Sequence, residues 1–266
     1  MSIDEFKDLL WQKGNELYRE MPWRQDTRPY YVLVSELMLQ QTQVSRVIPK
    51  FEAFIAAFPD ETALAKASLA DVLVMWQGLG YNRRAKFLHE SAMYIVSVCK
   101  GEWPSTKEDL MALPGVGVNT AGALLAYAFN QPSIFIETNV RTVYFYHFFK
   151  DQDDVHDNEI LPLIEQTIDQ EHPREWYWAI MDYGSWLKSQ GVRTNTQSTH
   201  YKKQSALRGS VREVRGQIIR ELTKGDSTEE TLREVMEADR RFEPALEGLI
   251  HDGLVSRRGS QLHLTK

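Results

Sequence analysis

One stretch decides the fold of this chain of 266 residues: Leu113-Pro114-Gly115-Val116-Gly117-Val118-Asn119-Thr120-Ala121-Gly122. Pro114 and the glycines Gly115 and Gly117 end a preceding helix and permit a tight turn. After the turn, apolar residues recur with helical spacing on one face, at Ala121, Leu124, Leu125 and Ala128. The stretch therefore predicts a helix, a glycine turn and a second helix whose first backbone amides point outward.

Two interpretations of this turn stay open on its own residues. Outward-pointing amides at a helix start suit an anion, and a run of turn amides can cradle a phosphate. The same residues also suit an ordinary corner between two helices. The flanking sequence has to decide between them.

Three further motifs flank the turn, in the order Ser35-Glu36-Leu37-Met38-Leu39-Gln40-Gln41-Thr42-Gln43-Val44, Gly78-Leu79-Gly80-Tyr81 and Ile136-Glu137-Thr138-Asn139-Val140-Arg141. In this order and spacing, the chain resembles the helix-hairpin-helix base-excision DNA glycosylases from about residue 20 to 187. It is most similar to their A/G-specific adenine glycosylase branch, with endonuclease III as the sister branch. The resemblance implies an all-α helix-hairpin-helix glycosylase fold and double-stranded DNA with a lesion or mismatch as the partner.

Composition limits the size of the core and the class of protein. With 42% hydrophobic residues, the chain can bury one large core, or a main domain and a small one. No apolar run approaches the ~20 residues of a membrane span, and the N-terminus lacks a signal-peptide core. The single cysteine, Cys99, excludes an internal disulfide and a cysteine metal site. We expect a monomeric cytoplasmic protein of the bacterial or archaeal nucleoid, with no membrane partner.

The net charge of −6 is unevenly distributed. Residues 188–220 hold eight basic residues and one acidic residue, a net +7, whereas residues 1–187 carry −10. Phosphate binding depends on local potential, so the basic segment is a candidate for attracting DNA. A solvated linker would have the same composition.

Helical periodicity predicts an all-α assembly up to a boundary after Leu187. The resemblance implies a glycosylase domain over residues 1–187, with a six-helix barrel at about 21–130 and a second helical subdomain from 1–20 plus 131–187. Within it, one apolar face over 62–77 predicts a helix. Residues 188–211 read as a basic linker. Residues 212–266 show three helical patterns and a hairpin around Arg258-Gly259-Ser260, which indicates a winged helix-turn-helix domain. A small protein–protein module would fit the same pattern.

Glu36 lies within the apolar run from Val32 to Leu39. Such a carboxyl is either on the solvent side of a helix or in a low-dielectric pocket that raises its pKa and keeps it protonated. The resemblance assigns Glu36 to the second case, as the catalytic acid that protonates a flipped adenine.

Glu137 follows the apolar run Ile134-Phe135-Ile136 and lies near a helix start, where a carboxylate is stabilised. In the resembling family an aspartate stands here and stabilises the oxocarbenium-like sugar. Glu137 keeps the charge but is one methylene longer, so its reach differs. We interpret it as a catalytic carboxylate in a reshaped site; a silent site is the alternative.

Asn119 is the third residue of the predicted catalytic set. The resemblance places it where the endonuclease III branch has a lysine that attacks the sugar. Asparagine cannot form a Schiff base, so the sequence predicts a monofunctional enzyme without efficient lyase activity.

The resemblance also implies a set of DNA-contacting residues. Gln40, Gln41 and Tyr81 are candidates for filling the gap that a flipped base leaves, since extrusion costs a few kcal/mol. Without the other motifs, a tyrosine after a glycine turn is better explained as a packing residue. The remaining candidates are Thr42, the hairpin residues Gly115, Val116 and Gly117, and Asn139 and Arg141.

Family members usually carry four cysteines spaced C-x6-C-x2-C-x5-C that bind a [4Fe–4S] cluster. The matching places here hold Lys188, Asn195, Ser198 and Gln204, none of which supplies a thiolate. We expect a member without the cluster; a monovalent cation at the hairpin is the only cofactor left open. The resemblance also implies a C-terminal domain by which adenine glycosylases read 8-oxoguanine; we expect the winged-helix tail in its place.

The sequence and the resemblance thus predict a glycosylase that hydrolyses the N-glycosidic bond of a flipped purine. The first candidate is adenine in a mismatch, with 8-oxoguanine as one candidate for the opposing base. Two rivals stay open: a clusterless glycosylase for another altered base, and a DNA-lesion-binding protein without catalysis.

Overall fold

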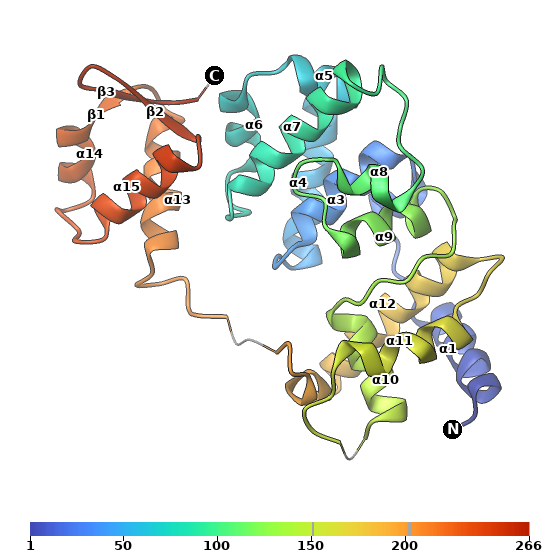
Figure 1. The fold of residues 1–266 in the computed structure, drawn as a ribbon. Helices are drawn as coiled ribbons and strands as arrows, with labels where there is room; N and C mark the ends of the chain where they lie inside the picture. Colours follow the sequence, from blue (N-terminus) through green and yellow to red (C-terminus); the bar gives the residue numbers. More distant parts are fainter. Residues whose placement is uncertain (151, 202–203, 266) are drawn as a thin grey trace. The chain divides into compact units, whose positions relative to one another are not determined.

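The computed structural model describes residues 1–150, 152–201 and 204–265. The regular secondary structure of these residues is helical apart from one small sheet and an isolated bridge between Val155 and Ser198 (Figure 1). The chain forms two compact units. The first unit comprises Met1–Val32, Ser105–Ala112 and Val116–Lys203, and the second comprises Leu33–Pro104, Leu113–Gly115 and Gln204–Lys266. The helical fold class is confirmed, whereas the predicted domain boundaries stay a prediction.

The first unit is organised around α12 (Pro173–Ser189), which packs against α1 (Ile3–Leu17) and α10 (Thr138–Phe148). The other helices of this unit are α2 (Pro22–Gln25), α8 (Lys107–Met111), α9 (Val118–Tyr127), α11 (Asp157–Thr167) and the 3-10 turn η1 (Thr194–Gln197). A capping box between Ser2 and Glu5 starts α1, because each side chain bonds the other's backbone amide. Aromatic rings fill the core of this unit, with Phe6, Tyr144 and Trp176 fully buried.

Helix α9 follows the glycine turn, as the sequence predicts. Its burial is wider than the single apolar face that we expected, because every residue from Thr120 to Tyr127 is buried. The small residues in this helix permit neighbouring segments to approach it closely. At Gly122, an added Cβ would lie 2.9 Å from the Cβ of Phe135. The helix is therefore a central element of its unit and not an amphipathic surface helix.

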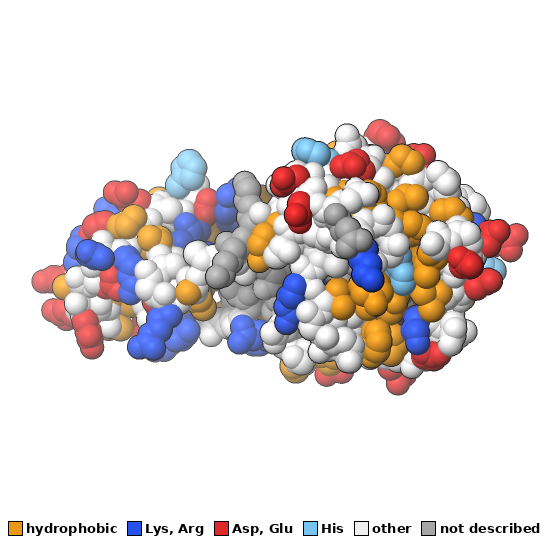
Figure 2. All heavy atoms as spheres, turned by 90° about the horizontal axis from the view of Figure 1, so that it is seen from below, with side chains coloured by type: hydrophobic (Ala, Val, Ile, Leu, Met, Phe, Trp, Pro, Cys, Tyr) orange, Lys and Arg blue, Asp and Glu red, His pale blue; other side chains and the backbone are white. Residues whose placement is uncertain are grey.

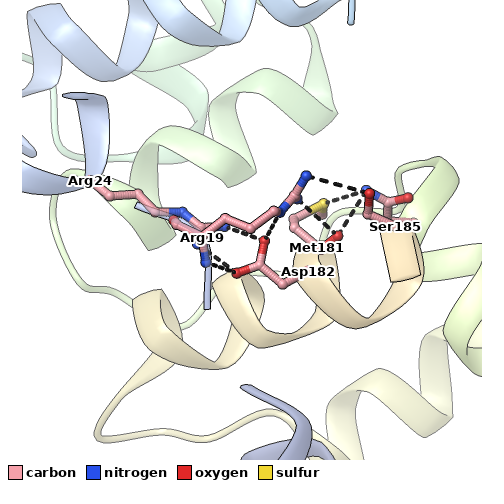
Figure 3. A network of polar contacts seen from close by, with 6 residues as sticks. Arg19, Arg24, Met181, Asp182 and Ser185 are labelled. Atoms are coloured by element: carbon pink, nitrogen blue, oxygen red, sulfur yellow. Dashed lines mark hydrogen bonds and ion pairs between the residues drawn. The ribbon is translucent and has the colours of Figure 1, made fainter. Parts of the chain in front are cut away.

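A buried ion-pair network fastens the N-terminal segment to α12 (Figure 3). The carboxylate of Asp182 accepts hydrogen bonds from both terminal nitrogens of Arg24, at 2.7 and 3.0 Å, and from Nε of Arg19 at 2.7 Å. The side chains of Asp182 and Arg24 are 1% and 3% exposed. Two arginines on one carboxylate leave net positive charge, which the backbone carbonyls of Arg19 and Met181 help to solvate.

The second unit begins with the C-terminal part of α3 (Pro29–Leu39) and continues through α4 (Val44–Ala57), α5 (Glu61–Lys66), α6 (Leu69–Trp76) and α7 (Arg83–Ser97). The single helix expected over 62–77 is wrong, since α5 ends at Lys66 and α6 begins at Leu69. Ser68 forms a capping box with Asp71, and this local hydrogen bonding starts a new helix in spite of the continuous apolar periodicity.

The C-terminal part of the second unit has the winged-helix arrangement that the sequence predicts. Three helices, α13 (Val211–Leu222), α14 (Glu229–Val235) and α15 (Phe242–His251), accompany a three-stranded sheet in the order β1-β3-β2. The strands are β1 (Ser227–Thr228), β2 (Val255–Arg258) and β3 (Gln261–Leu264). The hairpin β2–β3 is antiparallel, with Arg258 opposite Gln261 across the predicted turn.

The segment expected as an extended linker is partly helical. Helix α12 continues to Ser189, η1 covers 194–197, and α13 begins at Val211. In the described part of the chain, each helix is too short or too polar to cross a lipid bilayer.

Candidate DNA-contacting and base-release site

The two glycines of the turn differ in backbone conformation and in the space around them. Gly115 has a φ of +75°, and a Cβ placed there would lie 2.6 Å from the Cβ of Phe87. Gly117 is the N-cap of α9 with an extended backbone, and no described atom lies within 4 Å of an added Cβ. The side chain of Val116 is buried, at 6% exposure, whereas both glycines are exposed. The turn therefore offers backbone groups to solvent, as an anion-binding hairpin requires.

Two loops of the second unit bring predicted DNA-contacting residues together. Gln41 follows α3, Tyr81 follows α6, and both have left-handed backbones, with φ of 56° and 48°. The hydroxyl of Tyr81 donates to Oε1 of Gln41 at 2.9 Å. Both side chains are exposed and are hydrogen-bonded to each other. Together they project an amide and an aromatic ring, which are groups that can enter a gap in stacked bases.

Arg84, in the first turn of α7, fastens the two loops to each other. One terminal nitrogen, Nη1, bonds the carbonyls at the end of α3, and the other, Nη2, bonds those of the loop after α6. The five carbonyl acceptors are Leu37 (2.6 Å), Met38 (3.0 Å), Gln40 (2.6 Å), Leu79 (3.0 Å) and Gly80 (2.9 Å). Nη2 also lies 3.5 Å from the hydroxyl of Thr42. A single rigid guanidinium thus sets the positions of both loops.

The charge of Arg84 is solvated by these carbonyls instead of by an acid. The residue is 6% exposed, and no ion pair joins it to a carboxylate of the described residues. Desolvation lowers its pKa to about 10, which leaves it charged at neutral pH. Sequence reasoning missed this residue, although a signal exists: Arg84 shares a helical face with Leu88, Ala92 and Ile95. An arginine on an apolar face needs a buried set of acceptors.

A cavity of about 1080 Å³ opens beside Tyr81 within the second unit. The C-terminal segment forms part of its wall, together with Gln40 and Gln41. Its lining is strongly basic, with Arg46, Arg83, Arg84, Arg212, Arg215 and Arg220 against the acids Glu213 and Asp252. On the face drawn in Figure 2, both basic and acidic side chains are present. The sequence showed the basic segment, but not this cavity.

Glu36 lies in the part of α3 that belongs to the second unit. Its neighbours Ser35 and Leu37 are buried, whereas Glu36 itself is half-buried. The residue is thus neither on a fully exposed helix face nor sealed from solvent. Its function as the acid stays a prediction.

Asn119 lies in the first turn of α9 and is half-buried. Its Nδ2 donates to the carbonyl of Ile136 at 3.0 Å, and its Oδ1 accepts from the amide of the same residue at 3.2 Å. The side chain therefore binds one residue's backbone as a neighbouring β-strand would. Because Glu137 follows Ile136 directly, this pair restrains the backbone on which Glu137 stands. The catalytic function of Asn119 stays a prediction.

Glu137 is the N-cap of α10, yet its side chain makes no capping hydrogen bond. The carboxyl is thus at the positive end of the helix and is not used to hold the helix itself. Burial raises the pKa of Glu137, and the positive charge of Arg141 partly opposes this effect. Arg141, one turn further along α10, pairs with Asp157 through two bonds of 2.7 and 2.5 Å.

Asn139 and Gly184 mark a close approach of α10 and α12. A Cβ at Gly184 would lie 2.9 Å from both the Cβ and the carbonyl oxygen of Asn139. Asn139 donates through Nδ2 to the carbonyl of Met181 at 3.3 Å, and its buried Oδ1 has no partner among the described residues. Asn139 and Arg141 are therefore both engaged within the protein, and their predicted contacts with DNA stay a prediction.

The positions where the resembling family carries cluster cysteines do not fit an iron–sulfur cluster. Asn195 donates to the hydroxyl of Thr142 at 2.7 Å, and Ser198 forms a backbone bridge with Val155. Burial lowers the pKa of Lys188, which remains a poor metal ligand while protonated. Among the described residues, no group of three or more His, Cys, Asp or Glu side chains is placed to hold a metal ion. Polar contacts to α10 hold this loop.

Comparison with known families agrees with this geometry. The model of the HhH-GPD superfamily of base excision DNA repair proteins matches residues 34–166. The matched region contains Glu36, the loops of Gln41 and Tyr81, the glycine turn, and Glu137.

Relatives of known name are adenine DNA glycosylases. The protein from Mycolicibacterium smegmatis is 42% identical over 144 residues, which cover 54% of this chain and 48% of that protein. The human protein is 39% identical over 150 residues, covering 53% of this chain and 28% of that protein. The protein from Buchnera aphidicola is 32% identical over 171 residues, covering 63% and 48%. This chain thus spans about half of these relatives' length, or less.

Solved structures with a similar fold are DNA glycosylases and an endonuclease. A thermostable thymine-DNA glycosylase aligns with a TM-score of 0.63 and 21% identity, over 75% of this chain and 96% of that one. Endonuclease III, trapped as a covalent intermediate with DNA, aligns with a TM-score of 0.54 and 17% identity, over 70% and 86%. At these identities the likeness concerns the fold alone.

Proposed function

Because this chain belongs to the HhH-GPD superfamily of base excision DNA repair proteins, we propose that it is a monofunctional DNA glycosylase acting on adenine in mismatched duplex DNA. The names of its relatives support adenine as the base. The projection of Gln41 and Tyr81 supports a duplex that is opened at the mismatch. The absence of an amine at Asn119 supports hydrolysis instead of a covalent Schiff base.

In the proposed reaction, Glu36 donates a proton to a ring nitrogen of the flipped adenine. The bond between N9 and C1′ then breaks, and the electron pair leaves with the adenine. The ionised carboxylate of Glu137 stabilises the oxocarbenium-like sugar. Water adds its oxygen to C1′, and the proton that it loses restores the acid form of Glu36 through solvent. The products are free adenine and an abasic sugar.

The placement of Glu137 is the observation on which this proposal rests. A carboxylate at a helix N-terminus is stabilised there, and one that makes no capping bond keeps its oxygens available. The pair between Asn119 and Ile136 restrains the backbone directly before Glu137. A precise position is what an oxocarbenium-stabilising group requires.

One observation favours the rivals. Burial raises the pKa of Glu137 and so opposes the ionised form that the chemistry requires. A chain in which Glu137 stays protonated would bind a lesion without releasing a base, or would act on a base that leaves more easily.

The test is base release from a panel of labelled duplexes, followed by alkaline cleavage of abasic sites. The panel holds adenine opposite guanine, cytosine and 8-oxoguanine, adenine in a normal pair, and an alkylated purine. We expect cleavage of mismatched adenine by the native chain and none by Glu36→Gln or Glu137→Gln. Release of only the alkylated base would favour the first rival. Tight mismatch binding with no release from any duplex would favour the second.

Two further measurements test the predictions that the protein has no efficient lyase activity and no iron–sulfur cluster. Borohydride should trap no covalent protein–DNA adduct, because Asn119 supplies no amine. Metal analysis of the purified chain should show no stoichiometric iron. A trapped adduct or bound iron would each contradict the corresponding part of the proposal.

A further inference from the structure

Tyr81 is held by side chains from the C-terminal segment as well as by Gln41. Its hydroxyl donates to Gln41 at 2.9 Å and accepts from Nε2 of Gln204 and Nη1 of Arg212. A phenol has one proton and two lone pairs, so these three contacts use its full hydrogen-bonding capacity. The C-terminal segment is thus part of the surface that presents Tyr81.

The ring of Tyr81 also lies near two guanidinium groups. The central carbon of Arg84 is 5.5 Å from the ring centroid, and that of Arg212 is 5.2 Å from it. These distances are within the range of cation–π attraction. Arg84 is buried and committed to backbone carbonyls, so it cannot reach a ligand. Arg212 is half-buried and lines the basic cavity.

The acids at the cavity do not neutralise Arg212. Asp252 is paired with Arg83 and Arg215, and Glu213 is paired with Arg241. Arg212 bonds the backbone and hydroxyl oxygens of Ser205, and no ion pair joins it to a carboxylate of the described residues. Nη1 donates to Tyr81 and Nη2 donates to Ser205. The N–H of Nε and the second N–H of Nη1 therefore remain for an anion, and a planar guanidinium suits two oxygens of a phosphate.

We propose that Arg212 is a specificity-determining DNA contact: its guanidinium, placed on Tyr81 by the C-terminal segment, binds a backbone phosphate beside the nucleotide gap that Tyr81 fills. This inference rests on the proposed function and extends it to a part of the chain outside the family match. A repeating phosphodiester suits the cavity because several arginines are among its lining residues. The shared hydroxyl contact couples phosphate binding to the position of the tyrosine ring.

The test uses the full chain and a fluorescent duplex with one adenine mismatch, next to the same duplex fully paired. Arg212→Ala is compared with Arg208→Ala, which removes the same charge from an exposed residue that does not line the cavity. We expect Arg212→Ala to weaken mismatch binding about tenfold more than Arg208→Ala does, as for a charge-assisted contact. The difference between mismatched and paired DNA should also shrink.

A double-mutant cycle with Tyr81→Phe supplies the second readout. Removing the hydroxyl should reduce the effect of Arg212→Ala, because the two groups act through one contact. Arg212→Lys, which keeps charge but not the planar fork, should fall between native and alanine. Melting temperatures identify any variant that fails to fold, and in that case the lysine variant and Tyr81→Phe carry the test.

Equal effects of Arg212→Ala and Arg208→Ala, or additive effects with Tyr81→Phe, would overturn the inference. Tighter mismatch binding by Arg212→Ala would also overturn it and would show that the segment blocks Tyr81. Base release by the native chain is measured on the same duplex. Absent release with the expected binding pattern would refute the proposed chemistry but leave the Arg212 contact supported.

Discussion

Asn119 and Ile136 are joined through both polar atoms of the Asn119 side chain, at 3.0 and 3.2 Å. The pairing connects the first turn after the glycine hairpin to the residue that precedes Glu137. Helix α9 therefore does more than present backbone amides. Its residue Asn119 restrains the backbone of Ile136, two residues before α10 begins. An asparagine that cannot form a Schiff base is thus still suited to this position.

Asn119→Ala should lower single-turnover base release by about ten- to a hundredfold, because Glu137 loses its backbone restraint and small displacements of a reacting group are costly. Two lost hydrogen bonds should reduce the free energy of unfolding by about 1–3 kcal/mol. Rapid-quench assays at saturating enzyme measure the rate. Asn158→Ala, at an exposed site on α11, is the matched control. An unchanged rate in a folded Asn119→Ala protein would refute the positioning function.

The pH dependence of base release should reflect Glu137. Burial raises the pKa of this carboxyl, so the ionised form, and with it the rate, should be lost at a higher pH than for an ordinary glutamate with a pKa of about 4.3. Arg141 lowers the same pKa, so Arg141→Gln should move the acid limb of the rate profile to still higher pH. The profile is measured at saturating enzyme, which removes any effect on DNA affinity. An acid limb that does not move in Arg141→Gln would contradict this assignment.

The two hairpin glycines should differ in their tolerance of alanine. Gly115→Ala combines a left-handed backbone with a clash against Phe87, and should cost about 2–4 kcal/mol of unfolding free energy. Gly117→Ala meets an open space and an extended backbone, and should cost less than about 1 kcal/mol. Urea denaturation of both variants compares them directly. Equal losses would show that the turn differs from the one described.

Loss of the buried carboxylate of Asp182 should lower the free energy of unfolding far more than loss of a surface carboxylate. Asp182→Asn leaves the buried guanidinium of Arg24 without its counter-charge and should cost about 3–5 kcal/mol. Asp26→Asn removes an exposed pair with Arg28 and should cost about 0–1 kcal/mol. Chemical denaturation measures both. A loss at Asp182 as small as that at Asp26 would mean that solvent reaches the network.

The sequence by itself determined the helical class, the glycine turn, the family and the winged-helix tail. The helices, the turn and the hairpin follow from residues that are neighbours in sequence: glycine and proline at a turn, apolar residues at helical spacing, and alternation around Arg258-Gly259-Ser260. The family followed from the resemblance of four motifs in their order and spacing. The absence of cluster ligands at Lys188, Asn195, Ser198 and Gln204 could also be read directly, because a residue type alone excludes a thiolate.

Local pattern failed where short-range hydrogen bonding or long-range packing decided the outcome. The capping box of Ser68 and Asp71 divided a periodic run that the spacing alone joined into one helix. Helix α9 was expected to bury one face, but neighbouring segments enclose it on every side. Neither spacing nor composition contains the information on which segments approach an element.

Only the tertiary structure decided how the site residues are held. Arg84 lies 47 residues from Leu37 in sequence, and Asp182 lies 158 residues from Arg24, yet each pair is in direct contact. The pairing of Asn119 with Ile136 and the approach of Arg212 to Tyr81 are of the same kind. Such contacts depend on the path of the chain in three dimensions, because a hydrogen bond or an ion pair is set by distance and direction in space.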